Sequence, residues 1–176
     1  MKQSKVVLYV AMSLDGYIAR LDGSVDWLYD VQGDGGDNGY GDFYKGVGVV
    51  VMGRLTYDEV LKISDEFPYA GKPCYVLTRR EQAPDKYVHF TDEALDSLIP
   101  RLQTMSDGDV WLVGGGQLVQ AFLEHELIDE VQLTLIPKLL GEGIPLFPAG
   151  TVPGNLKLTG LERMGQMASI HYEVIK

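Results

Sequence analysis

The stretch that most constrains the fold is residues 110–123, VWLVGGGQLVQAFL. Four apolar residues run directly into Gly114-Gly115-Gly116, and apolar residues at helical spacing follow at once. This pattern predicts a buried strand, a tight glycine turn and the start of a helix. The first turn of a helix carries unpaired N–H groups and the positive end of the helix dipole, and glycines let an anion approach that backbone. The turn is therefore a candidate binding point for a cofactor pyrophosphate, and a plain strand-to-helix turn is the alternative.

The composition limits the classes of protein to consider. A length of 176 residues suits one domain spanning 1–176, and 45% hydrophobic residues supply its core. The net charge of −10 makes a nucleic-acid or membrane partner improbable on electrostatic grounds. With no leader and no apolar run near membrane length, we expect a cytoplasmic protein. The single cysteine, Cys74, lies in an apolar run and is predicted to be a buried hydrophobe, and no metal-ligand spacing occurs.

Strand-like and helix-like segments alternate along most of the chain. The predicted strands are residues 5–12, 47–52, 73–78, 87–90, 110–113, 129–136, 156–164 and 167–175. Helices are predicted from near Thr56, over residues 91–105 with a cap at Thr91, and after the glycine turn. This order predicts a three-layer α/β/α domain whose mixed sheet is mostly parallel and ends in an antiparallel hairpin.

Two connecting segments are rich in turn residues. Two Asp-Gly pairs bracket a short apolar island at residues 17–19, which predicts a long structured loop, and Ser24 is a candidate cap for a helical turn containing Trp27 and Leu28. Residues 32–41 contain five glycines, so we expect no stable helix there. That segment is either a mobile stretch or an irregular lid, with a surface insertion as the alternative.

Ligands of open α/β sheets bind beyond the carboxyl ends of the strands. This rule places four turns along one edge: residues 11–18, 53–56, 78–80 and 114–117. Arg54, Arg79 and Arg80 form the only basic cluster at that edge. Arginine suits phosphate because its planar fork offers paired donors, although a solvated surface pair is the alternative for Arg79 and Arg80.

Five motifs occur in a familiar order: VAMSLDGYIA, VVMGRLTYDEV, CYVLTRR, VWLVGGGQLVQAFL and VQLTLIPKLLGEGIPLFP. Together they resemble the dihydrofolate reductase-like superfamily from about residue 5 to 175. The closer likeness is to the reductase domain of bifunctional riboflavin biosynthesis proteins and to its stand-alone bacterial relatives. The resemblance implies a reductase that binds NADPH.

The resemblance also implies roles for individual residues at the cofactor. It places Ala11 beside the nicotinamide, with Ile18 across the ring. It places Gly53, Arg54 and Thr56 at the cofactor phosphates and Thr78, Arg79 and Arg80 at the adenosine end. The residues that it implies at the pyrophosphate are Gly114, Gly115, Gly116, Gln117 and Leu118.

The substrate end is less defined in the sequence. Hydride transfer to a C=N or C=O bond also needs a proton source, and Asp15 and Asp37 are the candidates. For Asp15 a purely turn-forming role is the alternative. Trp27, Thr134 and Lys138 are candidate substrate-binding residues, with Lys138 either meeting a substrate phosphate or simply solvated.

Three functions stay open at this point. The first is an NADPH-dependent reductase resembling 5-amino-6-(5-phosphoribosylamino)uracil reductase, acting on a small heterocyclic or ribosylamino substrate. The second is a reductase of dihydrofolate or another pterin, which the absence of a long acidic helix after the first loop disfavours. The third is a nucleotide-binding module with little turnover.

The terminal strands and the apolar connection after residue 136 predict a homodimer. The apolar residues of this connection fall outside the regular βα core, and large exposed apolar patches usually mark interfaces. The residues are Leu139, Leu140, Ile144, Leu146 and Phe147. Riboflavin-type relatives, as the resemblance adds, pair through this part of the fold.

Overall fold

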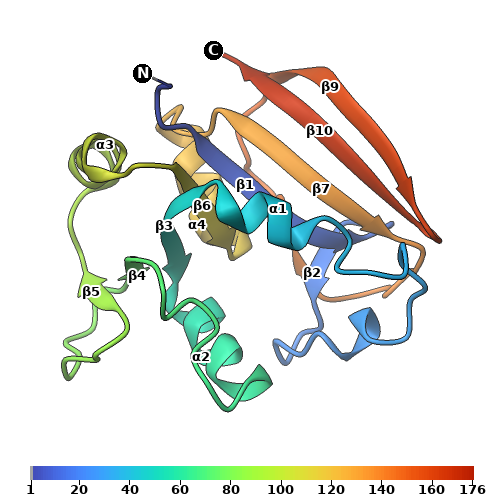
Figure 1. Ribbon diagram of the computed structural model, residues 1–176, viewed down its shortest axis with the longest axis horizontal. Coiled ribbons are helices and arrows are strands. Elements are labelled where there is room, and N and C mark those ends of the chain that lie inside the picture. Colours follow the sequence, from blue (N-terminus) through green and yellow to red (C-terminus); the bar gives the residue numbers. More distant parts are fainter. Residues whose placement is uncertain (1) are drawn as a thin grey trace.

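The computed structural model describes residues 2–176 and contains one large mixed sheet (Figure 1). Its strands are, in spatial order, β5 (His89–Thr91), β4 (Cys74–Leu77), β3 (Val47–Gly53), β6 (Asp109–Gly114), β1 (Val6–Ser13), β7 (Glu130–Ile136), β10 (Met167–Ile175) and β9 (Asn155–Met164). The first six strands pair in parallel, while β10 runs antiparallel to both β7 and β9. The predicted mixed sheet with a terminal hairpin is therefore confirmed.

Helices cover both faces of this sheet and complete the three layers. On one face α3 (Leu95–Met105) and α4 (Gly116–Glu124) pack on a core that includes Leu8 and Leu112. On the other face α1 (Tyr40–Lys45) and α2 (Arg54–Ile63) pack around Trp111. The central strands are buried on both faces, which explains why they are continuous apolar runs rather than alternating ones.

The glycine-rich segment 32–41 is ordered by its aspartates. Asp34 and Asp37 accept backbone N–H groups two to four residues further on, at 2.8–3.2 Å. These local hydrogen bonds supply the turns that the glycines permit, and α1 begins at Tyr40. The expectation of no stable helix was wrong at this boundary, because α1 gains its stability from packing. Its Phe43 ring stacks on Tyr9 of β1 with 3.8 Å between the centroids.

Three further local expectations need correction. The island at residues 17–19 is a short strand, β2 (Tyr17–Ala19), which pairs with β8 (Ile144–Pro145). The helical turn that holds Trp27 is the 3-10 helix η1 (Asp26–Leu28), and its cap position is Val25 rather than Ser24. Helix α3 starts at Leu95 instead of residue 91, because Thr91 is the last residue of strand β5.

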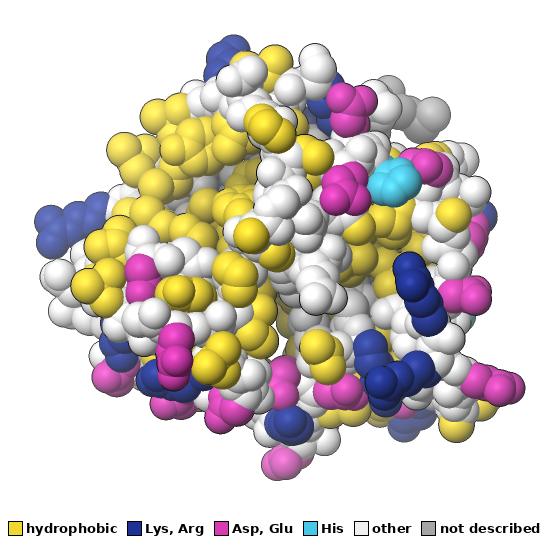
Figure 2. Space-filling model, turned by 180° about the vertical axis from the view of Figure 1, so that it is seen from behind, with side chains coloured by type: hydrophobic (Ala, Val, Ile, Leu, Met, Phe, Trp, Pro, Cys, Tyr) yellow, Lys and Arg dark blue, Asp and Glu magenta, His cyan; other side chains and the backbone are white. Residues whose placement is uncertain are grey.

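The terminal hairpin leaves an apolar face uncovered. Leu156 and Leu158 of β9 pair with Val174 and Tyr172 of β10, on the same face of the sheet as α4. No helix in residues 2–176 covers this part of the face, so Leu158 is 54% exposed. Figure 2, seen from that side, shows a broad hydrophobic area at the upper left, where the hairpin lies.

The connection after β7 only partly follows the prediction made for it. Leu139 and Phe147 are exposed, as expected of interface residues. Leu146 is fully buried, because β8 lies against the start of α4, and Leu140 packs on the cluster around Trp27. No helix in the described part of the chain has the length and apolar character needed to cross a membrane.

Candidate functional site

The four predicted turns meet at one edge of the sheet. Strands β4, β3, β6 and β1 are parallel neighbours, so their carboxyl ends lie side by side. A β-carbon built on Gly53 would lie 3.7 Å from the Gly114 carbonyl oxygen. One built on Gly115 would lie 3.6 Å from Thr56 Oγ1 and 3.9 Å from Ile18 Cδ1. Two sequence-distant segments, residues 11–18 and 53–56, therefore converge on the glycine turn.

The three glycines of the turn differ in whether the fold requires them. Gly114 has a φ of +131°, in the region that side chains rarely adopt, and the Gly114–Gly115 peptide bond is cis. Gly116 begins α4 so close to β8 that a β-carbon would collide with the Pro145 carbonyl oxygen. Gly115 has a φ of −82° and space for a β-carbon. The fold therefore requires glycine at 114 and 116 but tolerates alanine at 115.

Two helices begin at this edge with free backbone donors. The cap positions of α2 and α4 are Gly53 and Gly115, and neither helix has a side-chain cap or an acidic residue in its first turn. Such helix starts present N–H groups and positive dipole ends, which are suited to bind an anion.

Arg54 adds a charged donor at the same place. Its Nε donates to Asp58 Oδ1 at 2.9 Å, and its guanidinium carbon lies 5.7 Å from the Phe90 ring centroid. Nη1 is buried and has no hydrogen-bond partner among residues 2–176. A buried donor without an acceptor is unfavourable, and a phosphate oxygen would satisfy it. The residues present therefore fit a phosphorylated cofactor.

The basic pair after β4 lies at the outer part of this edge. Thr78 donates its backbone N–H to the Thr91 carbonyl at 3.0 Å, and its Oγ1 accepts the N–H of Arg80 at 3.2 Å. Arg79 and Arg80 are exposed and form no ion pair within residues 2–176. Both remain available for an anionic ligand, and the alternative of a solvated pair stays open.

The other two predicted pyrophosphate residues differ in exposure. Gln117 is exposed in the first turn of α4, whereas Leu118 is half-buried and packs on the core. Only the Gln117 side chain is therefore free to face a ligand.

Asp15 connects the turn after β1 to the connection after β7. It accepts hydrogen bonds from Ser13 Oγ at 2.6 Å and from the N–H groups of Leu140 at 3.2 Å and Gly141 at 2.8 Å. These bonds, above all the one from Ser13, lower the pKa of Asp15. The geometry matches the turn-forming alternative, and proton transfer by Asp15 stays a prediction.

Asp37 accepts the N–H groups of Gly39 at 3.0 Å and Gly41 at 2.8 Å, at the start of α1. Burial raises the pKa of Tyr9, and the charge of Asp37 raises it further. Asp37 thus lies near the face of β1 that also carries Ala11.

The three candidate substrate residues occupy different positions. Trp27 is buried among Ile136, Met164 and Met167, and its Nε1 has no partner among the described residues. Thr134 of β7 pairs in register with Ala11, so it lies beside the expected nicotinamide position. Lys138 forms an ion pair with Asp30 instead of standing free.

A polar row on the sheet was missed in the sequence. Ser169 and His171 of β10 pair with Thr134 and Gln132 of β7, on the face that bears Ala11. Ser169 Oγ and His171 Nε2 are 3.0 Å apart. The only signal in the sequence is that Ser169 and His171 are polar and two positions apart in SIHYE. This spacing does not indicate which strand pairs beside them.

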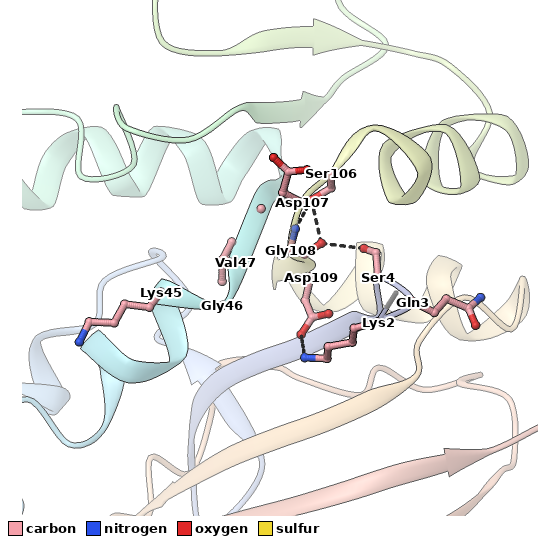
Figure 3. Close-up of a pocket in the computed structure, with 11 residues that line it drawn as sticks. Lys2, Gln3, Ser4, Lys45, Gly46, Val47, Ser106, Asp107, Gly108 and Asp109 are labelled. Atoms are coloured by element: carbon pink, nitrogen blue, oxygen red, sulfur yellow. Dashed lines mark hydrogen bonds and ion pairs between the residues drawn. The ribbon is translucent and has the colours of Figure 1, made fainter.

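A separate cavity lies at the opposite edge, beside the amino ends of β1 and β6 (Figure 3). Several of its polar groups satisfy one another: Ser4 Oγ and Ser106 Oγ both donate to the Gly108 carbonyl oxygen, at 2.8 and 2.7 Å, and Lys2 pairs with Asp109. The cavity therefore offers few free groups to a ligand.

Comparisons with known proteins agree with this geometry. Residues 4–169 match the family model of the RibD C-terminal domain. The Bacillus subtilis protein YwjB is 43% identical over 171 residues, which cover 97% of this chain and 98% of YwjB. A second Bacillus subtilis protein, YyaP, is 29% identical over 175 residues, covering 90% of this chain and 88% of YyaP.

Solved structures share the fold. A putative riboflavin biosynthesis protein from Shewanella sp. PV-4 has a TM-score of 0.88 and 31% identity, covering 98% of this chain and 99% of that one. A diaminohydroxyphosphoribosylaminopyrimidine deaminase/5-amino-6-(5-phosphoribosylamino)uracil reductase from Thermotoga maritima has a TM-score of 0.73 and 20% identity; the match covers 98% of this chain and 57% of that one. The model match spans most of the chain, and the sheet and glycine turn have the arrangement expected from it, so this protein belongs to the RibD C-terminal domain family.

Proposed function

We propose that this protein is an NADPH-dependent reductase that transfers hydride to a small heterocyclic or ribosylamino substrate. The observation that carries the proposal is the anion site formed by the uncapped starts of α2 and α4 with the buried, unpartnered Nη1 of Arg54. The family supports the same reading, since the Thermotoga maritima protein is named for a uracil reductase activity.

Each group of residues would hold one part of the cofactor. Gly53 and Gly115, as helix starts, would bind the phosphates, together with Arg54. Arg79 and Arg80 would meet the adenosine end. Ala11 and Ile18 would bracket the nicotinamide, and bound NADPH would supply hydride there. Thr134, which pairs in register with Ala11, would lie beside the substrate.

Calorimetry with NADPH tests the cofactor first. We expect a dissociation constant in the micromolar range, equivalent to roughly −8 kcal/mol. Arg54→Ala should weaken binding, whereas Arg101→Ala should not, because Arg101 is an exposed arginine of α3 engaged with Glu93. The absence of both binding heat and a thermal shift on addition of NADPH would refute the proposal.

An NADPH-oxidation screen then tests the substrate class. Turnover with 5-amino-6-(5-phosphoribosylamino)uracil or another ribosylaminopyrimidine would support the proposal. Turnover with dihydrofolate or pterins alone would favour the pterin reductase. Tight NADPH binding without oxidation in any of these assays would favour a nucleotide-binding module.

We also propose a homodimer, formed through the uncovered apolar face of the hairpin. Leu156, Leu158 and Leu161 are 45%, 54% and 69% exposed on β9. Apolar surface of this extent on one face is typical of an interface, and Figure 2 shows it as a continuous area. A second copy of this chain is the proposed occupant, in line with the pairing that the family resemblance implies.

A further inference from the structure

Two rows of side chains cross the face of the sheet that carries Ala11. Strand register aligns Ala11, Thr134 and Ser169 in one row. It aligns Tyr9, Gln132 and His171 in the next. Side chains two apart on a strand share a face, so both rows lie on the side of α1, which crosses β1 in Figure 1.

Ser169 and His171 form a hydrogen-bonded pair at the β10 end of these rows. Ser169 is 9% exposed, and its only side-chain partner within residues 2–176 is the imidazole Nε2, 3.0 Å away. Gly160 of β9 lies opposite His171, and a β-carbon there would lie 3.4 Å from His171 Cβ and 3.5 Å from Cγ. Residue 160 thus lies directly beside the imidazole.

The distance along the row suits a heterocyclic substrate. Ala11 and Ser169 lie two strands apart, which is about 10 Å at the usual strand spacing. With the nicotinamide beside Ala11, a ring placed over Thr134 would have the hydride donor at one end and Ser169 at the other.

The acids predicted as proton sources are engaged elsewhere. Asp15 accepts three hydrogen bonds in the turn after β1, and Asp37 accepts two at the start of α1. Imidazole is the side chain that ordinarily titrates between pH 5 and 8, which suits a general acid at neutral pH.

We propose that Ser169 and His171 deliver the proton in the reductase reaction, an inference that rests on the function proposed above. Hydride transfer from NADPH to the carbon of a substrate C=N bond leaves the electron pair of that bond on nitrogen, and NADP⁺ is formed. The nitrogen takes the hydroxyl proton of Ser169. Ser169 takes the Nε2 proton of the His171 imidazolium, and neutral His171 is reprotonated by water.

Other ionisable groups share this face and would affect its pH dependence. Glu162 of β9 pairs with Ser169, and Glu130 pairs with Glu173 beyond His171. Lys157 of β9 pairs with Glu173, Lys5 forms an ion pair with Glu130, and Tyr9, Asp37 and Tyr40 lie on the side of α1. A pH profile therefore assigns the proton to His171 only when the wild type is compared with a His171 variant.

Steady-state kinetics with NADPH and the ribosylaminopyrimidine, pterin and folate substrates of the screen test the pair. His171→Asn should lower kcat by about 10²- to 10⁴-fold, with little change in the KM for NADPH. Ser169→Ala should lower kcat similarly, and the double variant should be no worse than either single one, because both act in one path. His125→Asn is the matched control, since His125 pairs with Asp96 at the end of α4.

The pH profile gives the second readout. Wild-type kcat should fall in alkaline solution, because a neutral His171 has no second proton to pass to Ser169, and His171→Asn should lack that limb. Wild-type rates and pH dependence in His171→Asn would overturn the proton pair and leave the reductase function standing.

A binding readout separates the two proposals further. The imidazole C–H resonances of His171, assigned with His171→Asn, should shift when 5-amino-6-(5-phosphoribosylamino)uracil and NADP⁺ are added together. Unshifted resonances despite calorimetric binding of both ligands would overturn the placement of the pair. A wild-type protein that binds NADPH but oxidises it with none of the substrates would instead refute the reductase function.

Discussion

Single alanine substitutions at the three consecutive glycines should give different results. At Gly115 a β-carbon meets only Thr56 Oγ1 and Ile18 Cδ1, at ordinary contact distances, and the backbone is extended. Gly→Ala at a compatible position stabilises by about 0.4–1 kcal/mol through the unfolded chain. For a chain of this size that corresponds to a rise in melting temperature of roughly 1–4 °C.

Cofactor binding should respond in the opposite direction at Gly115. The new methyl group would stand between the start of α4 and Thr56, where the pyrophosphate is expected to approach the backbone. Loss of one charge-assisted hydrogen bond costs about 1.5–3 kcal/mol. Gly115→Ala should therefore weaken NADPH binding by about ten- to a hundredfold while the protein melts no lower than the wild type.

The neighbouring variants should lose stability instead. Gly114→Ala imposes a side chain at a φ of +131°, a strain of about 1–3 kcal/mol. Gly116→Ala drives a β-carbon into the Pro145 carbonyl oxygen, with an overpacking cost of about 1–3 kcal/mol. Gly71→Ala is the control, since a β-carbon there meets nothing within 4 Å.

Circular dichroism melts and NADPH fluorescence titrations on the same preparations measure both effects. At Gly115 the affinity for NADPH should fall while the melting temperature does not. A folded Gly115→Ala protein that binds NADPH as tightly as the wild type would remove the glycine turn from the cofactor site.

Three further predictions concern other parts of the molecule. Arg79→Ala should weaken NADPH binding about ten- to a hundredfold and leave NADH nearly unchanged in calorimetry, because the lost contact is to the 2′-phosphate; equal losses would contradict this role. Hydrogen bonds lower the folded pKa of Asp15, so its carboxylate contributes stability that is full above an unfolded pKa of about 3.9 and is lost as the pH falls through the folded value. Asp15→Asn should therefore melt below the wild type at pH 7, and the difference should vanish in acid; a difference that persists at pH 2 would argue against this linkage. Sedimentation should give about twice the chain mass of 19.5 kDa, and Leu158→Glu should give a monomer; a wild-type monomer at micromolar concentration would refute the dimer.

The edge of the sheet where the predicted turns meet followed from local patterns. Apolar runs that end in glycine predict strand ends, and parallel strands bring their carboxyl ends to one edge whatever their order. For this reason the sequence predicts that Gly53 and Gly114, 61 positions apart, share an edge without specifying the order of their strands, and the structure confirms it. The same argument located Arg54, but its unpartnered Nη1 depends on Phe90 and Asp58 and is visible only in the folded chain.

Element boundaries were less predictable where tertiary contacts outweigh propensity. Helix α1 forms beside a glycine-rich segment because Phe43 stacks on Tyr9, a residue more than thirty positions earlier. Residues 17–19 become a strand because β8, more than a hundred residues later, supplies the hydrogen-bonding partner. A local pattern does not encode such partners.

By itself, then, the sequence determined the strands of the main sheet, where they end in glycine turns, and that the last two strands form a hairpin, because apolar period and turn chemistry are local properties of the chain. Only the tertiary structure decided which strands are neighbours and in what register. The register aligns Ser169 with Ala11 and His171 with Tyr9, although the first member of each pair lies near the end of the chain and the second near its beginning. Register is set by burial of one whole sheet face against another layer, so it depends on the entire molecule at once.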